Sequence, residues 1–422
     1  MNEKLGKRFF IPLMTGLVLS GVHGAVAQNV GNPDFAPVYV PGDEVFLPFA
    51  GDVPLEQAQP FFDVDWSVQL RATHTGGTEQ GKNSVKLLPE ISLTRAGLRG
   101  QYVFDGQATL SVNDDQLTRV NNTQFGYSGQ YSLDSVSQLS GSLNLNVSQD
   151  DVNGPGVPDN IVQLPYNVSL KGELGVVRQF GRFSLEGSTR LERAYRGPTQ
   201  LVGNLLQDNS EFSFVKFGGD LRASYAFSPE ISLFVEGGAD RDWFDSAPAS
   251  TGIKLDGIDY QLRAGSALNW RDVLNVEASV GWVLRQHVDP SITDRGEAVY
   301  ALNIGYTPSN ALSFSGEIST TIVPEDVTAG RPRSVAYGAS GNVGYAIAPW
   351  IGLRASQTGR WVLPQTGVNT QTTLTTGLGV DVDINKNLAL NLDYLYTWSE
   401  NLPSSTEPEY EHAATIGIKY SR

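Results

Sequence analysis

The feature that most constrains this chain is a long alternation of apolar and polar residues, which recurs from about residue 65 to the C-terminus. Residues 215–227, 276–282 and 388–398 all show it, with an apolar or small residue at every second position. Successive side chains of a strand point to opposite faces, so this period predicts strands with one apolar and one polar face. Many runs extend over about ten residues or more. Soluble strands usually have about five or six residues, whereas membrane-spanning strands need about nine to eleven.

The segments that join these runs alternate between short and long. Residues 227–230 and 385–387 are short connections, whereas the polar segments 245–256 and 401–409 are longer. Outer-membrane barrels have short periplasmic turns and longer external loops in this order, with aromatic girdles at both interfaces. Aromatic residues gather beside both kinds of connection in this sequence. The predicted fold is therefore all-β, a closed antiparallel transmembrane β-barrel over residues 64–422.

The number of strands follows from where the alternating runs begin. We expect starts near residues 64, 88, 107, 122, 137, 166, 182, 212, 230, 256, 273, 297, 311, 334, 350, 371, 388 and 410. This gives about 18 strands, an even number that places both ends of the barrel on the periplasmic side. Sixteen strands is the alternative, because residues 88–104 are compatible with one long strand or with two.

Composition excludes several classes of protein. The chain has no cysteine, which removes disulfides and thiolate chemistry. Its net charge of −15 argues against a nucleic-acid partner, which would require a basic surface. A mean hydropathy of −0.20 is too polar for a bundle of membrane helices. It does not exclude a barrel, because only every second residue of a barrel strand has to be apolar.

The N-terminus predicts export from the cytoplasm. Residues 1–27 combine a positively charged start, an apolar stretch and the small residues Ala25 and Ala27, as in a cleaved signal peptide. Residues 28–63 are rich in proline, which disfavours regular helices and central strands. We interpret them as a loosely ordered periplasmic segment. The alternative is that residues 28–62 dock a periplasmic partner.

The polar faces of the strands supply the candidate site residues, because they would line the lumen. We take nine charged residues as candidates for solute selectivity: Lys216, Asp220, Arg222, Glu236, Asp259, Arg263, Glu277, Arg354 and Arg360. The same face is expected to carry Lys171, Glu173, Glu186, Arg190, Glu192, Asp240, Glu317, Asp381, Asp383, Asp393 and Lys419.

Two interpretations of these charges are open. They form a constriction that sorts solutes by charge, or they form cross-strand ion pairs that hold the wall in shape. The pairs expected across neighbouring hairpins are Arg222 with Glu236 and Arg263 with Glu277. The modest excess of carboxylates favours cations over anions.

Nothing in the sequence indicates an enzyme, a cofactor or a metal site. A hydrolytic barrel needs a serine, a histidine and an orienting polar residue within hydrogen-bond reach. Only His74, His287 and His412 follow the signal peptide, and we interpret each as a surface or interfacial residue. The standard metal, nucleotide and phosphate motifs do not occur.

The leading segment LPEISL at residues 88–93 and the turn YAFSPEISL at residues 225–233 follow the signal peptide and the proline-rich segment. Together they resemble the porin-like outer-membrane barrels associated with proteobacterial polysaccharide export. The resemblance covers roughly residues 60–422 and implies a location in the outer membrane and a part in moving surface polysaccharide. One departure is that the last aromatic residue, Tyr420, precedes the C-terminus by two residues, whereas many barrels end on an aromatic residue.

The expected function is thus a passive pore, or a conduit linked to the export of surface polysaccharide. The alternative is a non-conducting barrel with a structural or anchoring role. Expected partners are outer-membrane lipid, the barrel-assembly machinery, and small solutes or polysaccharide.

Overall fold

The computed structural model describes residues 62–78, 81–113, 118–149, 161–249, 252–323, 334–363, 370–402 and 407–422. The expected signal peptide lies outside the described residues, as does all of the proline-rich segment except its last two residues. In the described part of the chain, no helix is both long enough and apolar enough to span a membrane.

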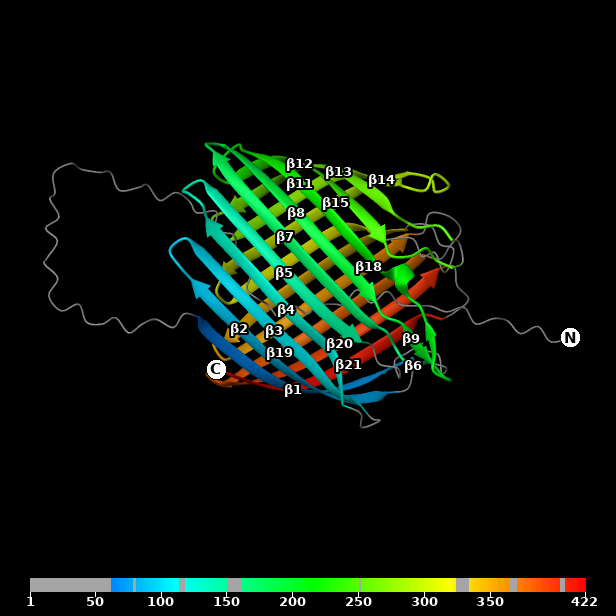
Figure 1. Cartoon of the computed structure of the whole chain (residues 1–422). Helices are drawn as coiled ribbons and strands as arrows, with labels where there is room; N and C mark the ends of the chain where they lie inside the picture. Colours follow the sequence, from blue (N-terminus) through cyan, green and yellow to red (C-terminus); the bar gives the residue numbers. More distant parts are fainter. Residues whose placement is uncertain are drawn as a thin grey trace, which may run out of the picture. The chain divides into compact units, whose positions relative to one another are not determined.

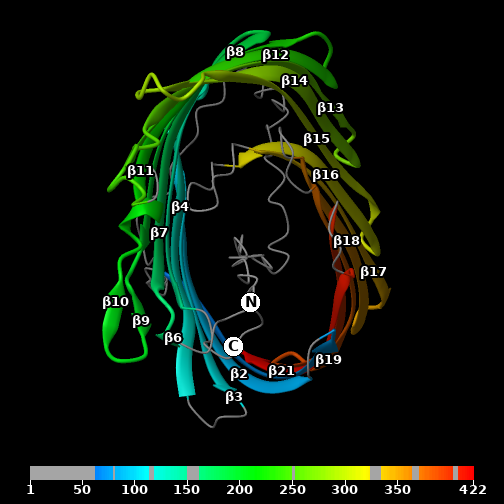
Figure 2. The same cartoon turned by 90° about the vertical axis from the view of Figure 1, so that its right-hand side faces the viewer.

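Eighteen long strands form one antiparallel sheet, and its first and last strands pair with each other. Because β1 pairs with both β2 and β21, the sheet closes into a barrel (Figure 1 and Figure 2). The prediction of a closed all-β barrel with about 18 strands is confirmed, and the alternative of 16 is wrong. The strands are β1 Asp63–Gly77, β2 Lys82–Ala96, β3 Gly100–Asn113, β4 Thr118–Ser132, β5 Ser137–Gln149, β7 Tyr166–Phe180, β8 Phe183–Arg196, β11 Phe214–Ala226, β12 Ile231–Phe244, β13 Gly257–Trp270, β14 Leu274–His287, β15 Arg295–Ser309, β16 Leu312–Val323, β17 Ser334–Ala348, β18 Ile351–Leu363, β19 Thr370–Asn385, β20 Leu388–Leu402 and β21 Glu409–Ser421.

A smaller sheet lies in the long connection between β8 and β11 and the segment before β7. It consists of β6 Ile161–Gln163, β9 Thr199–Leu201 and β10 Leu205–Gln207. A single 3-10 turn, η1 Ser210–Phe212, follows it. Asn209 fixes this connection, because its buried amide donates to the carbonyl oxygen of Gly197 at 2.7 Å.

The observed strand starts agree well with the predicted ones for β1 and from residue 137 onward, but not for the three strands between them. There β2, β3 and β4 begin at Lys82, Gly100 and Thr118, several residues earlier than predicted. Pro89 accounts for the late start predicted for β2, because it lies inside this strand although proline has no N–H to donate. The ladder between β2 and β3 passes from the pair Leu87 and Leu110 directly to Glu90 and Gln107, so it skips this position.

The apolar side chains of the barrel are mostly on its outer surface. Leu221, Leu262, Val280 and Trp282 share the outward face and are each more than half exposed in the isolated chain. Few hydrophobic side chains are buried among the described residues, and Phe234 is one of them. The barrel is therefore held by its closed hydrogen-bonded ladder and by polar contacts on the inward face, while its outward face matches a lipid environment.

Candidate functional site

The strand register places all the predicted polar-face residues on one continuous inward surface. For example, Lys216 lies opposite Asp242, and Arg222 lies opposite both Glu236 and Glu186. The nine selectivity candidates occur in two groups. Seven lie on β11 to β14, and the other two, Arg354 and Arg360, lie on β18.

Arg190 on β8 binds two carboxylates on the neighbouring strands β11 and β12. Its guanidinium donates to the carboxylate of Asp240 through Nε at 2.7 Å and Nη2 at 2.8 Å, and it also pairs with Asp220. Both carboxylates occupy space above glycines. A side chain at Gly218 would collide with Asp240, and one at Gly238 would collide with Asp220. These glycines thus leave the room in which one arginine bridges two strands.

A second arginine, Arg285 on β14, is only 8% exposed. It donates to Asp242 at 2.7 and 3.0 Å, to Asp259 at 3.1 Å and to the carbonyl oxygen of Leu255 at 2.9 Å. A buried charge is tolerated only when it is paired and hydrogen-bonded in this way. Lys216 adds weaker attraction, since its Nζ lies 3.8 Å from Asp259.

The same arginine ties the connection between β12 and β13 to the wall. Leu255, which accepts from it, is 6% exposed, and Asp256 accepts a hydrogen bond from the backbone N–H of Phe244 at 2.7 Å. At the start of this connection, Arg193 donates two hydrogen bonds of 2.6 Å to Asp245. These bonds hold the pKa of the Asp245 carboxyl below its ordinary value. We call Arg190, Lys216, Asp220, Asp240, Asp242, Asp259 and Arg285 the loop-side cluster.

Arg222 is the centre of a separate network nearer the short turns. It donates to both carboxylate oxygens of Glu277 at 3.0 and 2.9 Å, while Glu236 lies at 4.0 Å. Its guanidinium carbon lies 3.6 Å from the centre of the Phe234 ring, within cation–π distance. Phe234 in turn packs over Gly265, where an added Cβ would be 2.5 Å from the ring.

One expected ion pair is wrong. Arg263 does not face Glu277 across the β13–β14 hairpin, because the register sets it opposite Gly281 and sets Glu277 opposite Ala267. Glu277 is instead bound by Arg222, which reaches it from β11. Arg222 passes over the Phe234 ring on the way, and Phe234 itself lies opposite Gly265, which has no side chain to obstruct it. The other expected neighbours, Arg222 and Glu236, do face each other.

On the other side of the seam where the barrel closes, Arg354 joins β18 to β19 and β20. It donates to Asp381 at 2.9 Å and to Asp393 at 3.0 Å, above Gly379. Arg360, further along β18, lies opposite Thr373 and has no ion pair within the described part of the chain.

Sequence reasoning missed Asp242 and Arg285 as site residues. The signal was present, because both continue the inward series on their strands, Glu236, Gly238 and Asp240 on β12 and Gly281 and Val283 on β14. Each was close enough to a predicted loop to be taken as part of it.

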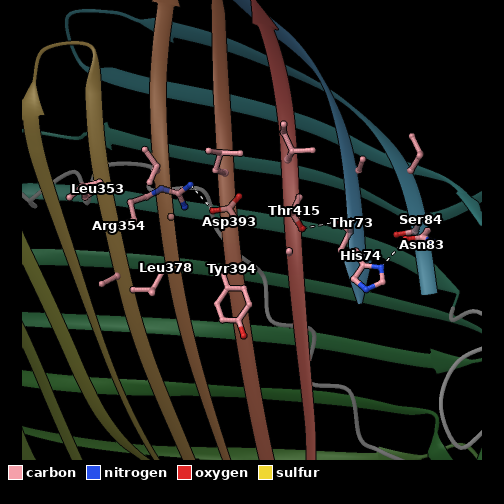
Figure 3. A pocket seen from close by; sticks show the side chains of 18 of the residues that line it. Thr73, His74, Asn83, Ser84, Leu353, Arg354, Leu378, Asp393, Tyr394 and Thr415 are labelled. Carbon is pink, nitrogen blue, oxygen red and sulfur yellow. Dashed lines mark hydrogen bonds and ion pairs between the residues drawn. The ribbon is translucent and has the colours of Figure 1, made fainter. Parts of the chain in front are cut away.

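A hollow of about 900 Å³ lies along β17 to β21, β1 and β2 (Figure 3). Most of its lining side chains, such as Leu353, Leu378 and Tyr394, belong to the outward face by register. His74, hydrogen-bonded to Asn83 at 2.9 Å, is at its edge. The hollow is therefore a feature of the apolar outer surface and not of the polar wall that carries the candidate residues.

No set of three or more His, Asp or Glu side chains in the described ranges is arranged to hold a metal ion. The inward face offers paired charges, hydroxyls and amides, which can hydrogen-bond a passing solute or water.

Comparison with known families decides the broader class. Residues 67–420 match the family described as "Putative beta-barrel porin 2". The chain belongs to this family of β-barrel porins. The match spans the whole barrel and agrees with the closed 18-stranded sheet, so this porin-like protein is assigned to the outer membrane. No protein of curated function matches the sequence significantly.

Solved structures that resemble the porin-like chain are also outer-membrane barrels. They include the siderophore receptor PirA from Acinetobacter baumannii, at 8% identity and a TM-score of 0.44, covering 85% of this chain and 80% of that one. OpdK from Pseudomonas aeruginosa, solved with vanillate, has 11% identity and a TM-score of 0.43, covering 85% and 99%. OccK2 from the same organism, solved with glucuronate, has 8% identity and a TM-score of 0.45, covering 85% and 98%.

Proposed function

We propose that this barrel is a passive pore for small polar solutes in the outer membrane. The observation that supports this most is the closed 18-stranded sheet with a continuous polar inward face. Barrel diameter grows with strand number, and barrels of about 16–18 strands leave an aqueous channel where eight-stranded barrels are filled by side chains.

The arrangement of charges supports a pore with weak charge selectivity. Arg190, Arg222, Arg285 and Arg354 each contact at least one carboxylate on the same wall. Paired charges on a wall largely cancel in their effect on a distant ion. The nine candidate residues would thus act first as wall-shaping ion pairs, and the excess of inward carboxylates would leave a small preference for cations.

Passage of a neutral polysaccharide is a second candidate function, favoured by the inward faces of β3, β4 and β5. Here uncharged amides bond to one another, with Asn146 donating to Asn122 at 2.9 Å and Gln138 donating to Gln130 at 3.0 Å. Amide and hydroxyl groups both donate and accept, so they can exchange these bonds for the hydroxyls of a sugar. We define this amide face as Gln107, Asn122, Gln124, Gln130, Gln138 and Asn146.

Single-channel recording in planar bilayers tests the pore directly. The full-length mature barrel, refolded and added to one side, should give discrete conductance steps. No current above that of protein-free bilayers would contradict the pore and favour the non-conducting structural barrel.

Liposome swelling with neutral oligosaccharides of increasing size then separates the two transport functions. Swelling that continues with long oligosaccharides supports the polysaccharide conduit, and a sharp size limit near a disaccharide contradicts it.

A further inference from the structure

Two cations face each other on the lumen wall next to the seam of the barrel. Arg71 of β1 and Lys86 of β2 are directly opposite in the antiparallel register. They share the inward face with Gln69 and Glu90, and both are half-buried. Side chains in directly opposite positions have Cβ atoms about 4.5–5.5 Å apart, and like charges there are destabilising.

In the described ranges no carboxylate forms a direct ion pair with either cation, unlike the arginines of the networks above, although Glu90 attracts Arg71 electrostatically from further away. The Nε atom of Arg71 is buried and has no hydrogen-bond partner. Glu90 is the nearest carboxylate in the register, but Lys419 and Ser67 bind it at 3.0 and 2.8 Å. A buried donor without a partner carries a free-energy penalty. Among the described residues, this pair of cations therefore has no anion in direct contact with it.

The wall leaves room for Arg71 on the side of β21. Gly417 faces it there, and a Cβ at that position would lie 3.2 Å from Cγ of Arg71. The neighbours of Arg71 along β1 are neutral and already bonded. Gln69 donates to Asn391 at 2.9 Å. The hydroxyls of Thr73 and Thr415 are 2.9 Å apart (Figure 3). None of these neighbours on β1, β20 and β21 carries a negative charge, and the carboxylate of Glu90, which attracts Arg71, is already bound by Lys419.

We propose that Arg71 and Lys86 form a binding station for the carboxylate group of a small solute within the lumen. The inference rests on the proposed pore, since it names a class of solute that would pass it. A guanidinium presents a planar fork that matches a carboxylate with two parallel hydrogen bonds. The ammonium group of Lys86 supplies further donors from the facing strand. A bound carboxylate would offset the like-charge repulsion between the two side chains.

Calorimetric titration of succinate into the refolded barrel in a non-ionic detergent at low salt tests the station. The wild-type barrel should bind succinate, and Arg71→Gln or Lys86→Gln should weaken the affinity by about tenfold or more, since each variant removes a charge-assisted hydrogen bond to the carboxylate. Lys171→Gln is the matched control. It removes the same charge from the lumen wall, but at an exposed pair with Glu192 at 3.3 Å on β7 and β8. It should bind succinate as wild type does.

A second measurement does not depend on any variant. Succinate should raise the thermal unfolding temperature of the wild-type barrel more than sodium chloride of equal ionic strength does. Inorganic phosphate in the same assay shows whether the station prefers a planar carboxylate, and phosphate binding tighter than succinate overturns the carboxylate assignment. Absence of succinate binding to wild type, or equal weakening in Lys171→Gln, overturns the station itself. Because these measurements need no current, a barrel that binds succinate but does not conduct contradicts only the pore.

Discussion

The loop-side cluster and the amide face are two parts of one inward surface, and they hold neighbouring strands together in different ways. The loop-side cluster binds its strands together with buried charges, as in Arg285 with Asp242 and Asp259. The amide face uses neutral side chains such as Asn122 and Asn146, which lie in the same kind of strand with the same alternation. The apolar–polar alternation of the sequence therefore decides which residues face the lumen. The residue types at those positions decide whether the strands are joined by buried ion pairs or present neutral groups that can exchange their hydrogen bonds with a solute.

Removal of Arg285 should give the largest difference between the two regions. Arg285→Ala leaves Asp242 and Asp259 buried without their cation, and breaking a buried ion pair from one side costs about 3–5 kcal/mol. Urea titration of folding into lipid vesicles measures this loss. Gln124→Ala on the amide face is the control, with an expected loss below about 1 kcal/mol because water can replace a neutral amide there. Similar losses of stability in the two variants would contradict the larger contribution expected from the buried ion pairs of Arg285.

Filling the space at Gly238 that the Asp220 carboxylate now occupies should cause a smaller loss of stability. Gly238→Ala places a methyl group where the Asp220 carboxylate now lies, so the bridge from Arg190 has to move. Crowding of this kind costs about 1–3 kcal/mol. Gly305→Ala is the matched control, because its nearest neighbour would be Cβ of Asn275 at a relaxed 3.9 Å. Unfolding midpoints in urea compare the two, and a larger loss in Gly305→Ala would contradict the packing argument.

The sequence predicted the fold well because the evidence for it is repeated in every strand. A two-residue period is a local property, and an error in one strand, as around Pro89 in β2, does not disturb the rest. Contacts between adjacent strands were partly accessible too, since a hairpin brings Arg222 opposite Glu236.

Contacts across several strands could not be predicted in the same way. The bond from Arg222 to Glu277 depends on the stagger of four strands and on Phe234, which contacts the guanidinium and packs against Gly265. Neither feature can be predicted from the apolar–polar alternation within a single strand. The pairing of Arg71 with Lys86 depends likewise on the register of β1 and β2, in the part of the chain where the predicted starts were least accurate.

Charge reversal in the Arg222 network tests whether paired charges still influence ions. Arg222→Glu should raise the permeability of potassium relative to chloride, and Glu236→Arg should lower it, each by about threefold (on the order of 0.6 kcal/mol for a screened charge). Reversal potentials in a salt gradient across planar bilayers measure both. Shifts of opposite sign support a role in selectivity for these two residues. Unchanged reversal potentials in both variants would leave them with a structural role only.

The amide face should show the smallest change in stability and the most specific change in transport. Asn146→Ala removes one neutral hydrogen bond to Asn122, which is expected to cost about 0.5–1 kcal/mol. If this face exchanges its bonds with sugar hydroxyls, the same variant should slow liposome swelling in a neutral trisaccharide while leaving swelling in glycine unaffected. Ser142→Ala, a smaller loss on the inward face of β5, serves as the control for altered width. A loss of stability as large as that of Arg285→Ala would mean that the amides also brace the wall, and the distinction between the two regions would then fail.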